Sequence, residues 1–577
     1  MMLSILFQNM VKNNPKSKLM VKNILIAFFL FFLLSTNIEV IAQDFPAWYL
    51  VNFTDKDNSP YDLGTPSEFI SQKAISRRSA QGIEFDSTDL PVNPNYIDSL
   101  EQLNLLVYHT SKWLNAALVK VDTITQISAL NSISIIDSIA YMAPFIEGKS
   151  QTQTKRESSP SKANTSPEEI KLSNFNATKN RIDMIELGPL LDNNYNGKGI
   201  HIAVLDNGFI NVNKMAAFSH LFDRKAIIMT RNFTNNGYHI YNSGSHGTAV
   251  LSTMAGFVYG EFVGSAIGAN YYLFKTEDNR YEYPIEEANW LFAAEVADSA
   301  GVDIITSSLV YSTFDDPNLD YTLEQLDGKT SLVSKAASLA IKKGIIVFNS
   351  AGNMGGGAWQ KIAFPADVDG LYSIGAVDKD EKLASFSSTG YSADGRIKPD
   401  FVAEGEGTPI IGPNEMIVKA NGTSFSNPFM AGAMATFLQA NPQIKHSDIY
   451  SSIVESSSNY YSPDSLIGYG IPNFYLASVL LNNKTTINEN SKDLFTILPN
   501  PFQDNLHILY TSIDSQLIDI YIYDTKGTVL YKNINISCNK GNNLIEIKSI
   551  NKMSAGTYIL QISNSEGVIS KKIIKER

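Results

Sequence analysis

Cysteine is almost absent from this sequence, since Cys538 is the only one among 577 residues. A single cysteine excludes a disulfide framework within the chain and any metal site built from several thiolates. We expect Cys538 to be a buried small apolar residue rather than a reactive thiol. Long basic runs are also missing, and the net charge is −12 with a pI near 5.2. This balance argues against nucleic acid as a partner.

The apolar run nearest the start of the chain, Ile24–Leu34, has only 11 residues. It is too short to cross a bilayer, but it suits the core of a signal peptide. A basic stretch precedes it, and Val40-Ile41-Ala42 offers a suitable cleavage site. Residues 1–42 are therefore predicted to be a signal peptide of a secreted or cell-surface protein, with Met20 as an alternative start. An uncleaved membrane anchor is the other interpretation.

At 577 residues the chain is too long for one ordinary core, so two to four domains are expected. The stretch Asn421–Pro428 contains Gly422 and Ser424, and the apolar run Phe429–Leu438 after it predicts a buried helix. Ser424 then lies at or near a helix N-terminus, where free N–H groups favour developing negative charge. Its hydroxyl can act as a nucleophile if a base is near. A plain serine cap is the alternative.

Three stretches upstream favour the interpretation of Ser424 as a nucleophile over that of a plain helix cap. Ile202–Gly208 is an apolar run that ends in Asp206 and predicts a buried parallel strand with a carboxylate at its end. His246 lies in Ser-His-Gly-Thr at the start of a predicted helix, and Asn353 follows the predicted strand of Ile345–Asn349 in a Gly-Asn turn. Strand ends and helix starts are where open α/β sheets bind their ligands.

These four blocks, in the order Asp, His, Asn, Ser, resemble the subtilisin-like (subtilase) serine peptidases over roughly residues 175–478. The resemblance implies that Asp206 orients the general base His246, that Ser424 is the nucleophile, and that Asn353 is the side-chain donor of the oxyanion hole. Two departures are visible: Asn207 stands where Ser, Thr or Ala is usual, and Phe425-Ser426 replace Met-Ala. Neither removes a reacting group, so they concern rate and fit.

The fold expected for residues 171–480 is α/β, a subtilisin-like parallel sheet covered by helices. The alternation of apolar strands with helices supports it. The strands are predicted at 201–205, 269–275, 302–306, 345–349 and 372–377, and helices at 288–300 and 332–343. By resemblance, two segments form the walls of the primary specificity pocket, with Val310 where glycine is usual. Their residues are Ser308, Leu309 and Val310 on one wall, and Ser350, Ala351 and Gly352 on the other.

A small α+β domain is predicted at residues 45–147, with strands at 49–53, 106–109 and 116–121 and helices at 66–78 and 96–105. It resembles the inhibitory propeptide of secreted Bacteroidetes-type subtilases, in the stretches 53–56, 76–78 and 111–115. An independent binding module is the alternative, because fold pattern alone does not determine function. Residues 148–170 lack periodicity and are rich in Ser, Thr and Lys, which predicts a linker. Lys155-Arg156 within it is a candidate processing site.

Residues 481–493 are predicted to be a second linker, and 494–577 contain short alternating strands that predict a small all-β sandwich. Strands are expected near 519–523 and 554–560, with a turn at 524–527. The stretch Leu498–Phe502 and the basic end resemble the C-terminal sorting domain of the type IX secretion system. A carbohydrate-binding module is the alternative, since small β-sandwiches host many functions.

Taken together, the sequence predicts a secreted serine endopeptidase that hydrolyses peptide bonds through an acyl-enzyme. The alternative is a catalytically silent, surface-exposed binding module with the subtilase fold. The expected partners are a protein or peptide substrate, the chain's own propeptide as inhibitor and the type IX secretion machinery, and a monomer is expected. No cofactor and no metal ligand is assigned, and a structural calcium ion is left open. Asp315, Asp316 and Asp320 are interpreted as a solvated acidic loop.

Overall fold

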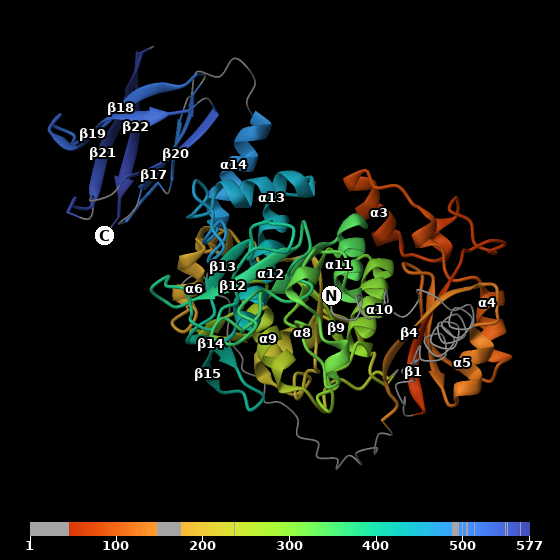
Figure 1. The fold of residues 1–577 in the computed structure, drawn as a ribbon. Helices are drawn as coiled ribbons and strands as arrows, with labels where there is room; N and C mark the ends of the chain where they lie inside the picture. Colours follow the sequence, from red (N-terminus) through yellow and green to blue (C-terminus); the bar gives the residue numbers. More distant parts are fainter. Residues whose placement is uncertain are drawn as a thin grey trace, which may run out of the picture.

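The computed structural model describes residues 45–146, 175–486 except 236 and 443, and 495–576 except 499, 504, 505, 513, 540, 548, 549, 551 and 566. The predicted signal peptide and the whole of the first linker, with the candidate processing site Lys155-Arg156, lie outside these residues. Figure 1 shows a central α/β domain with a smaller mixed domain on one side and an all-β domain on the other. The three parts follow the order of the chain, so each predicted domain corresponds to one continuous stretch of sequence.

The N-terminal domain is an antiparallel sheet with strand order β2-β3-β1-β4, covered on one face by two short helices. Strand β1 carries Tyr49 and Val51 toward these helices, and the same face of β3 contributes Val119. The other face, with Leu50 and Leu118, packs against the central domain. The bounds are β1 Ala47–Phe53, β2 Leu106–Ser111, β3 Ala116–Val121, β4 Ile136–Pro144, α3 Gln72–Gln81, α4 Pro94–Glu101 and α5 Ile124–Leu130.

One predicted helix is divided in two. Residues 66–78 were expected to form a single helix, but the structure has a 3-10 turn at Pro66–Glu68 and then α3, which begins at Gln72. Ser71 separates them because its extended backbone and its hydroxyl, which accepts from the Ala74 N–H at 3.2 Å, form the N-cap of α3. The second predicted helix, 96–105, begins earlier and ends at Glu101.

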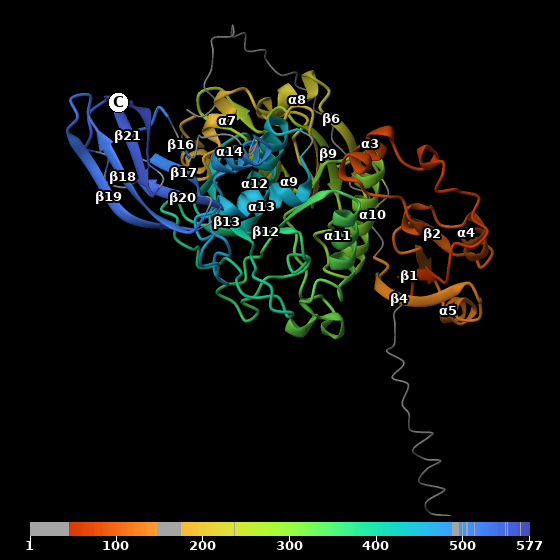
Figure 2. The same cartoon turned by 90° about the horizontal axis from the view of Figure 1, so that it is seen from above.

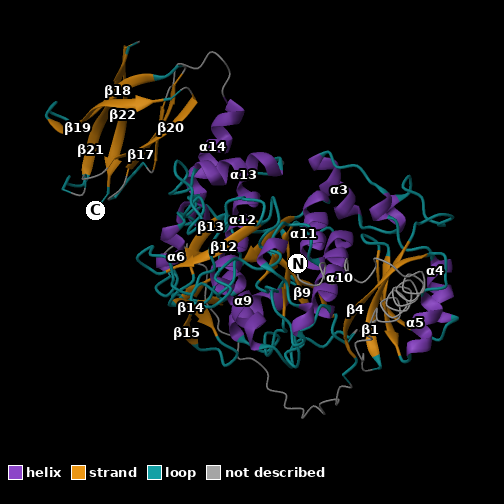
Figure 3. Cartoon of the chain, viewed as in Figure 1, coloured by secondary structure: helices purple, strands orange, loops and turns teal. Residues whose placement is uncertain are grey.

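The central domain is built on a seven-stranded parallel sheet with the order β13-β12-β11-β10-β5-β9-β6. Successive residues of β5 alternate between faces: Ile202 and Val204 pack with α9 and α12, whereas Ala203 and Leu205 pack with α10 and α11. Figures 2 and 3 show α10 and α11 on the side toward the N-terminal domain. The strands are β5 His201–Asp206, β6 Ile227–Asn232, β9 Asn270–Lys275, β10 Ile304–Ser307, β11 Ile346–Ser350, β12 Tyr372–Val377 and β13 Phe401–Glu404.

The helices of this domain are α6 Lys179–Met184, α7 Gly188–Asp192, α8 Ser219–Asp223, α9 Ser245–Ala255, α10 Ile285–Ala300, α11 Leu332–Lys342, α12 Thr423–Ala440, α13 His446–Glu455 and α14 Phe474–Thr486. Two small hairpins, β7–β8 (Phe257–Val258 and Phe262–Val263) and β14–β15 (Thr408–Ile411 and Ile417–Ala420), lie outside the main sheet. The five predicted strands and the predicted helices are confirmed to within three residues at each end. Periodicity identified them because each is buried along a whole face or on both faces.

The C-terminal domain packs a three-stranded sheet, β16-β17-β20, and a four-stranded sheet, β19-β18-β21-β22, around one core, which is the expected sandwich. Cys538 is 1% exposed within it, as predicted. Helix α14 continues to Thr486, into the predicted second linker, because Leu480 and Leu476 pack on Leu509 of the sandwich. The strands are β16 Phe495–Leu498, β17 Leu506–Ser512, β18 Gln516–Tyr523, β19 Val529–Cys538, β20 Gly541–Ile547, β21 Gly556–Asn564 and β22 Gly567–Lys575.

Across the described residues, every helix is too short or too polar to cross a membrane.

Candidate active site

Asp206 and His246 are brought together by the end of β5 and the first turn of α9. Asp206 is the last residue of β5 and is fully buried. His246 Nδ1 lies 2.8 Å from Asp206 Oδ1 and 3.1 Å from Oδ2. A carboxylate can only accept here, so Nδ1 carries the proton and Nε2 is left with its lone pair. The His246 side chain is 33% exposed, so its free nitrogen is within reach of a ligand.

Glycines allow this close approach of strand end and helix. A Cβ on Gly247 would lie 2.3 Å from the Gly208 carbonyl oxygen and 3.0 Å from Asp206 Cβ. Gly208 itself has φ +125, a conformation that side chains disfavour. Asn207 fits the same junction, because its Oδ1 accepts from the Gly247 N–H at 3.4 Å. Asn207, the first departure from the family pattern, therefore makes a contact that joins β5 to α9.

Ser424 is the second residue of α12, which begins at Thr423 after Gly422. It is 7% exposed, and the ring of the next residue, Phe425, lies 6.1 Å from the His246 ring. Within the described residues His246 and Ser424 are not hydrogen-bonded to each other, which is common before substrate is bound. The second departure is also accommodated: Phe425 packs beside the imidazole, and the Ser426 hydroxyl donates to the Gly375 carbonyl at 2.9 Å.

Asn353 is held by the same helix turn. Its Oδ1 accepts from the backbone N–H of Thr423 at 2.9 Å and from the Thr423 hydroxyl at 3.0 Å. These two bonds determine which way the amide is turned, so Nδ2 is directed away from Thr423. The Ser424 backbone N–H and Asn353 Nδ2 are therefore two donors near the start of α12.

Of the two predicted pocket walls, the stretch 308–310 lines an open cavity, whereas 350–352 does not border it. Leu309 and Val310 are half-buried and border this cavity of about 490 Å³, together with His246. Ser308 and Ser350 are buried, and their hydroxyls donate to the carbonyls of Ser424 and Thr423 at 3.1 and 3.0 Å. The two walls are thus bonded to consecutive carbonyls of the first turn of α12.

Two buried asparagines that the sequence did not single out support these segments. Asn349 Nδ2 donates to the Leu309 carbonyl at 3.0 Å, which ties β11 to the wall after β10. Asn427, one turn into α12, donates to the Ser307 carbonyl at 3.0 Å and to Thr306 Oγ1 at 3.2 Å. The only signal in the sequence was an amide inside an otherwise apolar strand and helix, a pattern that also fits a capping or turn residue.

The charges around His246 make it a stronger base. Burial lowers the pKa of the imidazole, but the charge of Asp206, its hydrogen bond and the charge of Glu277 together raise that pKa above its ordinary value. A neutral imidazole with a raised pKa accepts a proton readily and releases it less readily. In the pH–rate profile of any activity that depends on neutral His246, the midpoint of the acid limb therefore lies above the pKa of a free imidazole.

The acidic loop around Asp315 is more structured than a solvated loop. Asp320 Oδ1 accepts from the Phe314 N–H at 2.7 Å, and Asp316 accepts from the Asn318 N–H at 3.0 Å. Asp315 Oδ2 accepts from the Glu282 N–H at 3.1 Å. A different acidic group, which the sequence did not identify, lines the same cavity as Val310 and consists of Glu277, Glu282 and Glu286.

Comparison with known proteins agrees with this geometry. Residues 197–470 match the model of the subtilase family, residues 48–159 the peptidase S8 propeptide domain of Bacteroidota, and residues 496–576 the secretion system C-terminal sorting domain. Subtilisin DY of Bacillus licheniformis is 26% identical over 48% of this chain and 90% of its own length. Subtilisin of Bacillus pumilus is 28% identical over 52% of this chain and 97% of its own length.

The fold is similar to that of the epidermin leader peptide processing serine protease of Staphylococcus aureus, with a TM-score of 0.51 and 16% identity over 76% of this chain and 99% of that one. The chain thus carries a subtilase peptidase domain between a Bacteroidota-type propeptide and a type IX sorting domain. It is a subtilisin-like serine endopeptidase, and its sorting domain means that it is secreted or displayed at the cell surface.

The propeptide domain docks on α10 through buried charges. Asp298 of α10 pairs with Arg77 at 2.6 Å, Arg78 at 2.9 Å and Lys112 at 3.1 Å, all from the propeptide. One turn earlier, Glu295 accepts from the Lys112 backbone N–H at 2.8 Å. Burial by itself raises the pKa of Asp298, but the three cations lower it below its ordinary value. Asp298 and Glu295 therefore bind the propeptide from one helix, beside further ion pairs of Asp303 with Lys73 and of Lys343 with Asp86 and Asp89.

Proposed function

We propose that the peptidase cleaves its substrate through Asp206, His246 and Ser424, with an acyl-enzyme on Ser424. The observation that supports this is the 2.8 Å contact of His246 Nδ1 with the buried carboxylate of Asp206, beside the helix turn that carries Ser424. A serine hydroxyl is barely ionised at neutral pH, so a base must take its proton as it attacks.

In the first step, Ser424 Oγ forms a bond to the scissile carbonyl carbon while His246 Nε2 takes the hydroxyl proton. The negative charge passes to the carbonyl oxygen, which the Ser424 N–H and Asn353 Nδ2 stabilise. His246 then gives the proton to the leaving amine, the C–N bond breaks, and the acyl-enzyme remains. Water repeats the sequence and releases the acid, with the imidazolium stabilised by Asp206 in both halves.

Labelling by a fluorophosphonate tests this function directly, because the reagent bonds only to an activated serine. We expect the matured wild-type enzyme to be labelled and Ser424→Ala not to be labelled. A protein that folds, as judged by its thermal unfolding, but that remains unlabelled would support the alternative of a catalytically silent binding module.

The second part of the proposal concerns substrate specificity at Val310. Its branched side chain is half-buried on the wall at 308–310, where glycine would leave more room. We expect the wild type to favour small residues before the scissile bond over Phe, Tyr or Leu. Val310→Gly should relax that preference by about 10–200-fold, the range for such steric changes in a pocket. A peptide library varied at that residue measures it, and identical profiles for the two enzymes would contradict this role.

The third part concerns export. The C-terminal sandwich has its own core, and the catalytic residues all precede it. We propose that it directs the chain through the type IX machinery and takes no part in cleavage. Truncation after residue 490 should leave kcat of the purified peptidase unchanged within about twofold but retain the protein in the periplasm of its native cell. Cell fractionation and immunoblotting measure this, and normal surface delivery of the truncated chain would refute it.

The fourth part is that the N-terminal domain, docked on α10, inhibits the peptidase until it is removed. The chain's own propeptide is then its first partner. The buried charges of the interface support this, because they keep the domain in one orientation relative to the peptidase.

A further inference from the structure

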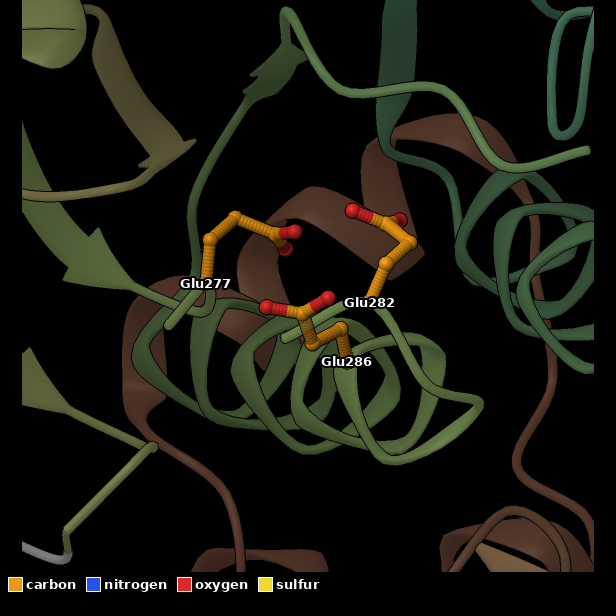
Figure 4. Close-up of side chains that lie close together, drawn as sticks. All are labelled: Glu277, Glu282 and Glu286. Carbon is orange, nitrogen blue, oxygen red and sulfur yellow. The ribbon is translucent and has the colours of Figure 1, made fainter. Parts of the chain in front are cut away.

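Three glutamates converge beside the catalytic cleft. Glu277 and Glu282 lie in the segment between β9 and α10, and Glu286 lies in the first turn of α10. One carboxylate oxygen of each lies within 4.8 Å of the other two. Figure 4 shows the three side chains directed toward a common point. Like charges at this separation repel each other, so the arrangement is costly unless a carboxylate takes up a proton or a positive charge joins it.

One of these carboxylates has an oxygen without a partner. Glu286 is 1% exposed; its Oε1 accepts from the Asp278 N–H at 2.7 Å, while its Oε2 is buried and makes no hydrogen bond. Glu277 is 8% exposed and uses Oε1 to accept from the Tyr311 hydroxyl at 2.7 Å. A buried polar atom left unpaired costs free energy, so Glu286 Oε2 indicates a donor that the chain itself does not supply.

Neighbouring basic side chains make other contacts. Arg280 pairs with Asp278 at 2.6 Å, and Lys275 Nζ donates to Ser243 Oγ at 3.1 Å. Among the described residues, no lysine, arginine or histidine side chain forms an ion pair with Glu277, Glu282 or Glu286. Burial and mutual repulsion raise the pKa of Glu277 and Glu286, and burial together with Asp315 raises the pKa of Glu282 to about 7. A cation from outside would relieve this repulsion.

The glutamates line the same cavity as the catalytic cleft. This cavity of about 490 Å³ is lined by His246, by Leu309 and Val310, and by the three glutamates. Its volume is that of a ligand pocket, far more than a bare ion fills. The cavity therefore has room for a cationic side chain that arrives with the substrate. Calcium, which takes six to eight oxygens including water, is the competing occupant that the test below distinguishes.

We propose that Glu277, Glu282 and Glu286 form a subsite for a lysine or arginine side chain of the peptide substrate. This inference rests on the proposed function of the cleft. The position of the cavity beside the wall at 308–310 assigns this side chain to the part of the peptide before the scissile bond. An ammonium group has three N–H donors, which match one free oxygen from each glutamate, and a guanidinium has five. Hydrogen bonds between charged groups are the strongest that such a pocket can offer.

The test compares peptides that differ only at one residue, two to four positions before the scissile bond. Each position carries lysine, arginine or the neutral isostere norleucine. For the matured wild-type enzyme we expect kcat/KM at one of these positions to favour lysine or arginine over norleucine by about 10–100-fold. Glu286→Gln and Glu282→Gln should reduce that ratio toward one while leaving the norleucine peptide nearly unchanged. Glu261→Gln, an exposed glutamate in the turn between β7 and β8, is the matched control and should keep the wild-type ratio.

Two outcomes would overturn the proposal. The first is a wild-type enzyme that cleaves the lysine, arginine and norleucine peptides equally at every position, a result that needs no variant to fold. The second is calcium binding, measured by calorimetry, that Glu286→Gln abolishes while the preference for lysine persists, because the site would then hold a divalent ion. Fluorophosphonate labelling separates these results from failure of the proposed function. If the enzyme is labelled but shows no preference, only the proposed subsite is contradicted. If it is not labelled, the proposed catalytic residues are contradicted as well.

Discussion

Replacement of Ser424 or His246 by alanine is expected to lower kcat by about 10⁶-fold, the magnitude established for the related enzyme subtilisin. Without Ser424 Oγ there is no nucleophile, and without His246 no group takes its proton. Asn353→Ala is expected to cost less, about 10²–10³-fold in kcat, also the subtilisin magnitude, because the Ser424 N–H remains to bind the oxyanion. Hydrolysis of a chromogenic peptide by the matured enzymes measures all three.

The control for this series is Ser451→Ala, which removes an exposed hydroxyl on α13 and should leave kcat unchanged. Thermal unfolding of every variant separates loss of chemistry from loss of fold. Full activity of Ser424→Ala would show that another residue is the nucleophile. Equal losses for Asn353→Ala and Ser424→Ala would show that Asn353 acts through the position of the helix turn, since its Oδ1 holds Thr423.

Asp298→Ala is expected to weaken inhibition by the propeptide by about 10²–10⁴-fold. The change leaves Arg77, Arg78 and Lys112 buried against α10 without their common carboxylate. Removing one partner of a buried ion pair costs about 3–5 kcal/mol because the remaining charge is not solvated. The inhibition constant of the purified propeptide domain, which has its own core, against matured wild-type and variant enzyme measures this effect.

Lys73→Ala in the propeptide is the matched control. Lys73 also crosses the interface and lies 2.8 Å from Asp303, but its side chain is 35% exposed. Exposed pairs contribute about 0–1 kcal/mol, so its inhibition constant should change less than about fivefold. Equal effects of Asp298→Ala and Lys73→Ala would show that buried charge does not dominate the docking of this domain.

The catalytic residues and the order of the domains were predictable from the sequence, through motifs that resemble one family. Asp206, His246 and Ser424 stand at a strand end and at two helix starts, positions that periodicity and glycine placement indicate locally. In the structure Asp206 and His246 are in contact. Ser424 precedes Phe425, whose ring packs beside the His246 ring. Local signals support such a prediction because each motif joins a buried element to a turn within a few residues.

Only the tertiary structure decided how distant segments meet. In the sequence, Glu286 is one acidic residue among several in the first turns of a helix; in the fold, one of its oxygens is buried without a partner, beside Glu277. Asp298 likewise has no distinguishing feature in the sequence, but in the fold it is buried and pairs with Arg77 and Lys112 of the propeptide. Burial and pairing of a charge depend on contacts between residues far apart in sequence, and these contacts are determined by the packing of whole elements, which no local pattern records.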